Sequence, residues 1–392
     1  MDRDHWQEDL KIYYEKAIMM RRYFHGHPEL SGEEKDTKAY VRNVLEKADI
    51  IYRICPSNGG IAAVVGTACE GTALGIRAEL DALPITEKTG LPFASTAPGV
   101  MHACGHDIHL AAVLSFALFL KQYEKMLHFP VCFFFQPAEE TTGGAEAMIA
   151  DGALKDPEVG HMIGFHVNPR LPAGTAEFLP GIMNAAVTDF ELTVHGASCH
   201  GAHPEEGCDA IVASAAIIQA LQSVPSRRFA PTTPVIVTVG TVHAGNENNI
   251  VAGEAVMTGT LRALDQTVMD RLTEAVRKIC LETASAFGAD AEFRTTVSYP
   301  ALENDREYTE RLETAAVRVL GKENVLRMEA PSLGADDFSF FASQARSCYF
   351  NIGCLGKGQD QEGQALHSDR LSPDESCMMT VMGLLADFLF GS

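Results

Sequence analysis

The densest group of potential metal ligands lies in the segment 101–109, which reads Met-His-Ala-Cys-Gly-His-Asp-Ile-His. Cys104 and His106 are donors for a borderline-soft divalent metal, and their spacing in a turn at the mouth of a predicted helix lets both side chains converge. An isolated histidine or cysteine is usually a core or surface residue. Four such residues within eight positions favour a metal site. Asp107 is expected to orient a ligating imidazole through its other ring nitrogen.

Two adjacent carboxylates form a second cluster. Glu139 and Glu140 follow an apolar strand and Pro137, which places them at the carboxyl edge where open α/β sheets bind ligands. Adjacent glutamates are most often a solvated pair, but charges directly after a buried strand are better explained by two different functions. One carboxylate would bind metal and the other would accept and donate a proton.

Two further histidines have comparable places in the sequence. His166 ends an apolar strand, and His367 directly precedes the last predicted helix. Each histidine alone would favour a structural role. Their common placement at strand ends and loop–helix junctions adds both to the candidate site.

The elements that must position these residues alternate along the chain. A first helix is expected from Trp6 to Phe24, and Ser31 to Glu34 are expected to form a capping box for a second helix. Apolar, β-branched runs predict two strands that pair with each other across a short turn. The alternation that follows predicts an α/β domain, a mixed sheet with helices on both faces. The strands are expected at 60–67, 72–80, 130–135 and 161–167, and helices at 106–126 and 144–151.

Residues 185–299 have a different rhythm. They read as β-α-β-β-α-β, the order of a ferredoxin-like α+β domain. The α/β pattern then resumes, with a helix at 308–320, a strand at 348–353 and a helix at 373–389. We therefore predict one catalytic domain formed by residues 1–184 and 300–392, interrupted by a smaller lid or dimerisation domain at 185–299.

Composition and charge exclude several classes of protein. The chain has 392 residues and a formal net charge of −21, which disfavours binding to nucleic acid and to anionic membranes. No apolar stretch is long enough to cross a bilayer, and the charged start of the chain does not resemble a signal peptide. Ten scattered cysteines without CxxC pairs indicate reduced thiols, so we expect a cytoplasmic protein.

The chain resembles the M20 family of metallopeptidases, and within it the amidohydrolase branch of aminoacylase, hippurate hydrolase, auxin-conjugate hydrolase and N-acetyl-diaminopimelate deacetylase types. The similarity runs through nearly the whole chain in order. The matching segments are 25–31, 77–84, 101–109, 136–140, 164–166, 200–204, 240–245 and 366–367.

This resemblance implies a metal-dependent amidohydrolase that cleaves N-acyl amino acids or related small amides. It implies two divalent metal ions, zinc or manganese, with cobalt or nickel also compatible. Glu139 matches the family's catalytic carboxylate, which accepts the proton of the attacking water and passes it to the leaving amine. The implied metal ligands are Cys104, as the bridge, with His106, Glu140, His166 and His367.

The same resemblance implies roles for residues of the inserted domain. His200 matches a histidine that donates to the oxyanion of the reaction, often in the partner subunit's site, which implies a homodimer. Asn249 and Arg262 match positions that bind a substrate carboxylate, a task that suits a guanidinium. Asp81, like Asp107, is expected to hydrogen-bond to the metal ligands without contacting the metal itself.

Several departures from the family pattern bear on the substrate. The family usually has aspartate where this chain has Glu79, and a Glu-Asp-Phe element where this chain has Asp336-Asp337-Phe338. The segment 246–249 and Ala252 also differ from the common pattern. The acidic pair Glu205-Glu206 keeps open a dipeptidase that attracts a free amine, although a surface pair is the simpler reading. A non-catalytic homologue that binds a small ligand is the third alternative, and the intact Glu139 and ligand set argue against it.

Overall fold

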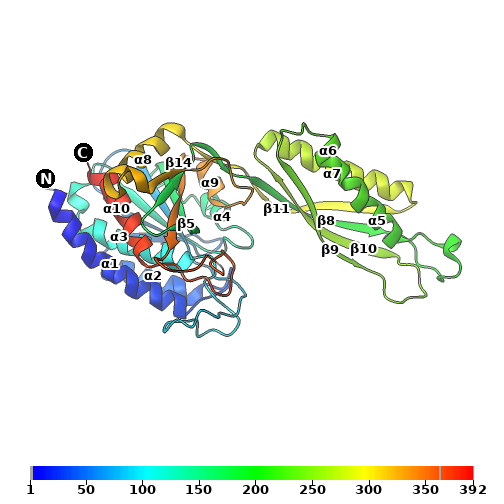
Figure 1. Cartoon of the computed structure of the whole chain (residues 1–392), viewed down its shortest axis with the longest axis horizontal. Helices are drawn as coiled ribbons and strands as arrows, with labels where there is room; N and C mark the ends of the chain where they lie inside the picture. Colours follow the sequence, from blue (N-terminus) through cyan, green and yellow to red (C-terminus); the bar gives the residue numbers. More distant parts are fainter. Residues whose placement is uncertain (1–2, 362, 392) are drawn as a thin grey trace. The chain divides into compact units, whose positions relative to one another are not determined.

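A computed structural model describes residues 3–361 and 363–391, which form two compact units (Figure 1). The large unit consists of the described residues up to Met183, of Glu303–Ala330 and of the described residues from Asp337 onward. The inserted unit consists of Asn184–Leu302 and Pro331–Asp336. The short second segment belongs to the inserted unit because the Ala185 N–H donates to the carbonyls of Ser332 and Gly334, at 3.1 and 3.0 Å.

An eight-stranded mixed sheet forms the centre of the large unit. Its strands lie in the order β1-β2-β4-β3-β5-β14-β6-β13, and the neighbours β4, β3, β5 and β14 run parallel. The strands are β1 (Ile51–Ile54), β2 (Ile61–Val65), β3 (Ala73–Glu79), β4 (Val131–Gln136), β5 (Val159–Pro172), β6 (Ala176–Phe178), β13 (Val325–Arg327) and β14 (Arg346–Leu355). The predicted mixed sheet is thus present.

The predicted pairing of the first two apolar strands is wrong. β2 pairs antiparallel with β4, and β3 pairs parallel with β4, so β4 lies between them. All six residues of β4 are buried, as expected for a central strand covered on both faces.

Helices cover both faces of this sheet. The helices α1, α3, α8 and α10 share one apolar core with its strands. On the other face Phe341 of α9 stacks near Phe134, with ring centroids 5.5 Å apart. Gly164 of β5 permits Phe338 of α9 and Tyr349 of β14 to pack against this strand, because an added Cβ would lie 2.7 Å from Tyr349 and 2.8 Å from Phe338. The helices are α1 (Arg3–Gly26), α2 (Lys35–Lys47), α3 (His106–Gln122), α4 (Ala145–Ala150), α8 (Arg306–Leu320), α9 (Phe338–Ala342) and α10 (Ser376–Phe390), with single 3-10 turns η1 (Glu124–Met126) and η3 (Lys322–Asn324).

The capping box predicted before α2 does not form. Ser31 Oγ donates instead to Asp81 Oδ2 at 2.6 Å. Glu34 Oε1 accepts from the N–H groups of Gly32 and Ala138, each at 2.8 Å. Both side chains therefore brace the loops that follow β3 and β4 rather than the start of α2.

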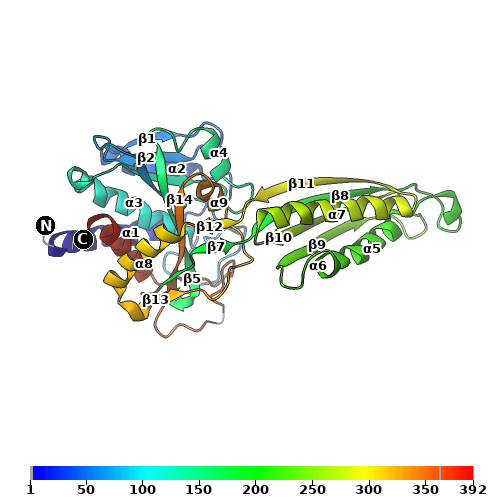
Figure 2. The same cartoon turned by 90° about the horizontal axis from the view of Figure 1, so that it is seen from above.

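The inserted unit is an antiparallel sheet in the order β11-β8-β10-β9, with α5 and α7 packed on one face (Figure 2). This order of four strands is that of the predicted ferredoxin-like fold. Its elements are β8 (Ala186–His195), η2 (Pro204–Glu206), α5 (Ala210–Leu221), α6 (Ser223–Arg227), β9 (Val235–Ala244), β10 (Glu254–Ala263), α7 (Gln266–Ala286) and β11 (Asp290–Tyr299). The strands β7 (Gly181–Asn184) and β12 (Leu302–Asn304) pair with each other. Among the described residues, no helix has the length and apolar character of a membrane span.

Candidate metal centre and active site

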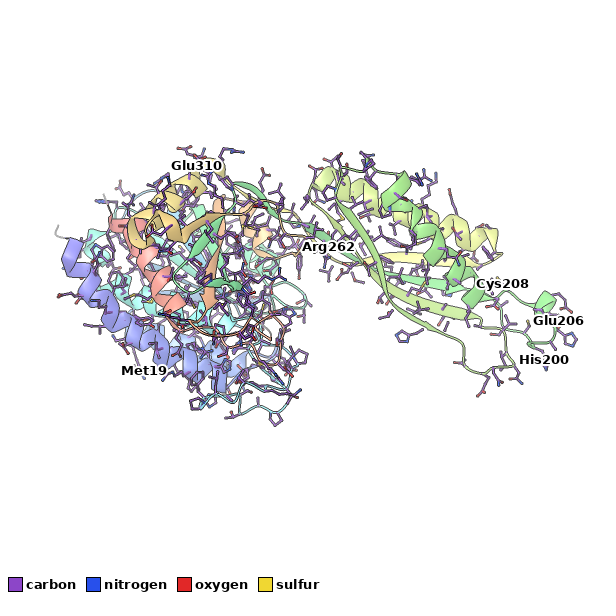
Figure 3. All side chains as sticks on the ribbon, in the orientation of Figure 1. Met19, His200, Glu206, Cys208, Arg262 and Glu310 are labelled. Carbon is purple, nitrogen blue, oxygen red and sulfur yellow. The ribbon has the colours of Figure 1, made fainter. Side chains whose placement is uncertain are left out.

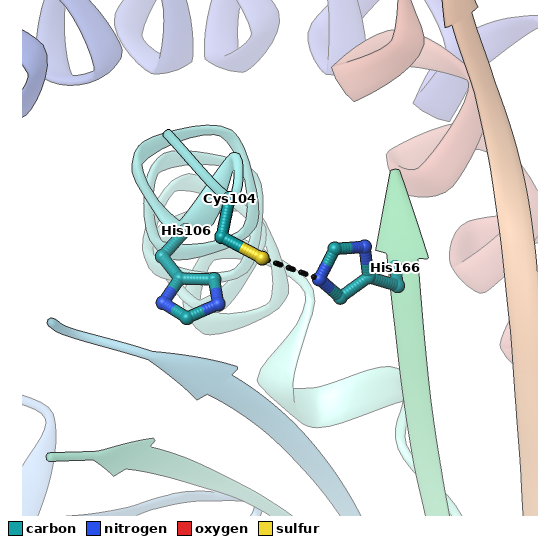
Figure 4. Close-up of side chains that lie close together, drawn as sticks. All are labelled: Cys104, His106 and His166. Atoms are coloured by element: carbon teal, nitrogen blue, oxygen red, sulfur yellow. Dashed lines mark hydrogen bonds between the residues drawn. The ribbon is translucent and has the colours of Figure 1, made fainter. Parts of the chain in front are cut away.

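The five predicted metal ligands of the large unit converge at the carboxyl edge of the sheet. Cys104 and His106 lie at the start of α3, His166 lies in β5, and Glu140 follows β4. Because β3, β4 and β5 are parallel neighbours, the segments that follow β3 and β4 emerge at one edge, next to the His166 region of β5. Figure 4 shows Cys104, just before α3, pointing to His166, with His106 beside Cys104.

The ligand atoms lie at the distances expected around shared cations. Cys104 Sγ is 3.3 Å from His166 Nε2, and Glu140 Oε1 is 3.2 Å from His367 Nε2. Two ligand groups share Cys104, one with His106 and His166 and the other with Glu140 and His367. Within each group the ligand atoms lie within 4.8 Å of one another. A thiolate between two such groups can bridge two metal ions.

The buried polar atoms at this place fit a divalent metal. His106 Nε2 is buried and has no hydrogen-bond partner of good geometry among the described residues. Its nearest carboxylate oxygens belong to Glu140 and Glu139, at 3.9 and 4.0 Å. These separations are too long for hydrogen bonds but suit ligands about 2 Å from a common ion. Burial raises the pKa of the Cys104 thiol well above its usual range, and a bound cation would favour the thiolate.

Asp81 orients the His106 ring. His106 Nδ1 is 2.9 Å from the Asp81 carbonyl oxygen and 3.2 Å from its Oδ1, so Nε2 faces the other ligands. The Asp81 carboxylate also accepts from the Glu140 N–H at 2.9 Å. Burial raises the pKa of Asp81, but these hydrogen bonds outweigh burial and lower it to about 2. Asp81 therefore fixes two of the ligand-bearing segments at once.

Asp107 does not contact a ligating imidazole, and that prediction is wrong. Its Oδ2 is 2.8 Å from His25 Nδ1 and 2.9 Å from Arg21 Nε. The other His25 nitrogen is 3.1 Å from Glu87 Oε1. Because α3 turns the Asp107 side chain away from that of His106, Asp107 ties the start of α3 to α1 instead.

The backbone is strained at two loops of the site. His367 and Ala138, the residue before the carboxylate pair, have φ values of 64° and 57°, in the left-handed region that non-glycine residues rarely adopt. The His367 N–H donates to the Ala103 carbonyl at 2.7 Å, and the Ala138 N–H is held by Glu34. Surrounding hydrogen bonds therefore hold both loops in conformations that bring His367 and Glu140 together.

The residues predicted in the inserted unit do not form one cluster. His200 and Asn249 lie on two adjacent exposed loops, where the Gly201 N–H donates to the Asn249 carbonyl at 2.7 Å. Arg262 lies near the opposite end of β10 and is paired with Asp189, at 3.8 Å. Since β10 has ten residues, about 30 Å of strand separates the two ends. Figure 3 shows His200 and Arg262 at opposite ends of this unit. Within one chain, Asn249 and Arg262 cannot hold the same carboxylate.

The chain was compared with protein families, with curated proteins and with solved structures, and all three comparisons point to one family. The profile described as Peptidase family M20/M25/M40 matches residues 75–390. An N-acetyldiaminopimelate deacetylase of Exiguobacterium sibiricum is 35% identical, over 95% of this chain and 98% of its own. An N-acetylcysteine deacetylase of Bacillus subtilis is 35% identical, over 88% and 90%. The crystal structure of Bacillus subtilis YXEP protein, a dinuclear metal-binding peptidase of the M20 family, superposes with a TM-score of 0.78 at 30% identity, over 97% of this chain and 98% of that one.

Proposed function

The chain belongs to peptidase family M20/M25/M40 and is a metal-dependent hydrolase of amide C–N bonds, and we propose that its substrates are N-acyl amino acids. The observation in the structure that supports metal-dependent hydrolysis is the pair of ligand groups sharing Cys104, with Glu139 beside them. Glu139 Oε2 is 4.0 Å from His106 Nε2, so a second carboxylate borders the ligand cluster.

The enzyme uses two divalent metal ions, and we propose that zinc or manganese occupies the site. A thiolate with imidazole ligands suits zinc, while cobalt and nickel also accept this set. When bound, the ions lower the pKa of a water molecule and polarise the amide carbonyl. One ion would be held by His106 and His166, the other by Glu140 and His367, with Cys104 shared.

We propose that Glu139 transfers the proton. Glu139 directly follows Ala138, whose N–H donates to Glu34, and it is adjacent to Glu140. One carboxylate would therefore bind metal while the other would transfer the proton. Glu139 would take the proton of the attacking water and return it to the nitrogen of the leaving amine. Asp81 and Glu34, by holding the flanking backbone, keep this carboxylate in place.

We further propose a homodimer in which His200 acts in the partner subunit's site. Figure 3 shows His200 at the end of the inserted unit opposite Arg262, and Asn249 lies beside the His200 loop. One chain therefore cannot gather all three residues around one substrate, and we propose that a second copy provides the missing ones. In this arrangement Arg262 of one chain binds the substrate carboxylate, and the partner provides a donor to the oxyanion.

The acyl amino acid assignment is supported by the two deacetylase relatives, and a hydrolysis screen tests it. Apo-protein would be reloaded with each metal separately and assayed against N-acetyl amino acids, N-benzoyl amino acids and dipeptides. We expect turnover of the N-acyl substrates and strong loss of rate for analogues whose carboxylate is amidated. Equal rates for the amidated analogues would contradict carboxylate recognition.

A dipeptidase is the second candidate. The observation that favours it is the acidic turn η2, where exposed Glu205 and Glu206 lie on the same loop as His200. Such charges would attract the free amine of a dipeptide. Faster hydrolysis of dipeptides than of their N-acetylated forms would establish this alternative. Metal binding without turnover of any amide would instead indicate the non-catalytic homologue.

The proposed setting is a reducing compartment, the cytoplasm, because all ten cysteines are free thiols. The net charge of −21 supports a small-molecule substrate rather than nucleic acid or an anionic membrane. A carboxylate substrate must enter against this charge, so Arg262 and the two cations would provide the local attraction.

A further inference from the structure

His109 is a buried histidine of the active-site region without a role so far. It lies one helical turn after His106 on α3 and is fully buried. Its ring centroid is 4.7 Å from that of His166 and 5.7 Å from that of His106. His109 therefore packs against two of the residues that would hold metal.

Both ring nitrogens of His109 are already engaged by protein groups. The Val167 N–H donates to Nε2 at 3.0 Å. Because an amide N–H can only donate, Nε2 must be unprotonated, and the proton is on Nδ1. Nδ1 then donates to Glu79 Oε2 at 2.9 Å. Nδ1 of His109 is therefore its donor and Nε2 its acceptor, and neither ring nitrogen is left for a metal.

The peptide that His109 holds belongs to the residue that follows His166. His166 Nδ1 donates to the Val167 carbonyl at 2.8 Å, which leaves Nε2 to face Cys104. Val167 thus receives one hydrogen bond from the ligand ring and gives another to His109. Any rotation of the Val167 backbone would move the His166 ring as well.

Glu79, the anchor of His109, is itself fixed by a buried network. Arg77 Nη1 pairs with Glu79, Arg77 Nη2 is 2.6 Å from Asp337 Oδ1, and Arg77 Nε donates to Gln136 at 2.9 Å. Glu79 is therefore held by Arg77 with Oε2 facing His109, where it accepts the proton that His109 carries on Nδ1.

We propose that His109 is a positioning residue for His166, acting through the Val167 peptide, and that Glu79 sets its tautomer. The proposal rests on the metal-dependent function above. In this proposal the buried hydrogen-bond network of Arg77, Glu79 and His109 fixes the orientation of the His166 ring. Loss of such a supporting hydrogen bond typically weakens metal binding about 10- to 100-fold.

Two amide variants separate the two hydrogen bonds of His109. In His109→Gln the side-chain oxygen can reach the place of Nε2 and accept from Val167, whereas the bond to Glu79 is lost. In His109→Asn the amide can replace Nδ1 as donor to Glu79, but nothing accepts from Val167. His161→Asn is the matched control, since this half-buried histidine lies on the same strand β5 and stacks on Tyr308.

The measured quantity is metal affinity. The apo-proteins are titrated with Co²⁺, and binding is detected by the thiolate-to-cobalt absorption of Cys104. We expect His109→Asn to lose about 10- to 100-fold in affinity at one of two sites, and His109→Gln and His161→Asn to stay within about threefold of wild type. Equal losses in both His109 variants, or no loss in either, would overturn the proposal. A wild-type protein that binds fewer than two ions would instead overturn the proposed function.

A second measurement uses the wild-type protein alone and does not depend on how the variants fold. Long-range ¹H–¹⁵N correlation spectra of ¹⁵N-histidine-labelled apo-protein report the tautomer of each ring. We expect a His109 signal with a protonated Nδ1 and an unprotonated Nε2 that is a hydrogen-bond acceptor. A protonated Nε2 in His109 would exclude the bond to Val167 and contradict the proposal.

Discussion

The candidate residues of the large unit and of the inserted unit differ in how firmly their own chain holds them. Cys104 and His106 are buried, and His106 is oriented by Asp81, which is itself held by other groups. His200 and Asn249 are exposed on loops. The His200 ring accepts a hydrogen bond from the N–H of Ala202, only two residues away, at 3.0 Å.

The residues proposed as metal ligands are thus all held within one unit of one chain. His200 and Asn249, in contrast, would act only on groups that lie outside the inserted unit. The large unit fixes the His106 ring and the Glu140 backbone through the buried Asp81 carboxylate, and therefore prepares them before any metal or substrate arrives. The inserted unit provides a stable sheet and leaves its functional side chains at the surface. The experiments below should affect the two units in different ways.

The largest effect is expected at the proton-transferring carboxylate. Glu139→Gln should lower kcat by about 10²- to 10⁴-fold, because the amide cannot accept the proton of the attacking water. Metal content, measured by plasma emission spectrometry, should stay at the wild-type value. The control is Glu70→Gln at an exposed position. Near-normal turnover in Glu139→Gln would remove this residue from the mechanism.

A large loss of stability is expected from the buried network of the large unit. Asp337→Ala leaves Arg77 and Gln136 without their shared carboxylate, so we expect a cost of about 3–5 kcal/mol in the free energy of unfolding. The exposed pair Glu274–Arg277 on α7 of the inserted unit is the matched control. Glu274→Ala should leave the urea midpoint of the apo-protein unchanged. Similar losses in both variants would mean that the two units do not differ in this respect.

Removing the exposed histidine of the inserted unit should affect turnover alone. His200→Ala should lower kcat by about 10²- to 10³-fold through loss of an oxyanion donor, with metal content and the unfolding midpoint unchanged. The loss of metal from this variant would show instead that His200 supports the ligand cluster.

Subunit mixing decides in which chain His200 acts. Random dimers of His200→Ala and Glu139→Gln chains contain one intact site in each mixed dimer only if the histidine acts in the partner. Activity should then recover to about a quarter of wild type, since half of the dimers are mixed and each has one intact site of two. Activity no higher than that of either parent would place His200 in its own chain's site.

The smallest expected effect concerns acid stability of the large unit. Burial raises the pKa of Glu87, but hydrogen bonds from His25, the Ser95 N–H and Thr89 lower it to about 2 from an ordinary 4.5. Because the folded pKa is depressed, this stabilisation is present above about pH 4.5 and is lost as the pH falls toward 2. Glu87→Gln should cost about 1–3 kcal/mol at pH 6 and progressively less down to pH 3, in urea unfolding of the apo-protein. A constant difference across this range would contradict the assignment.

The fold class could be predicted because it depends on local signals, and the residues proposed as metal ligands do lie together. Residue types at short spacing identified Cys104, His106 and the glutamate pair, and strand ends located His166. Alternation of apolar runs was enough for the sheet and for the inserted βαββαβ unit.

What the sequence did not predict depends on lateral neighbours. The pattern of β2 and β3 cannot show that β4 lies between them, and the helix pattern cannot show that Asp107 faces His25. Ser31 and Glu34 have capping residue types, yet stronger partners lie at Asp81 and Ala138. The short strands β1, β6 and β13 lie at or next to the two edges of the sheet, and their sequences have no clear strand pattern. His109 belonged to the recognised motif, but its role depends on Val167, distant in sequence.

The position of β14 has a consequence for how the protein is made. β14 lies between β5 and β6 in the sheet but follows the entire inserted unit in the chain. On the ribosome the large unit therefore keeps an open place in its sheet until residue 355 has been synthesised, while the inserted unit already has all its strands and can fold. His367 emerges later still. A translation product that ends before residue 346 thus lacks both a central strand and His367, a proposed metal ligand, so we expect it to have no hydrolytic activity.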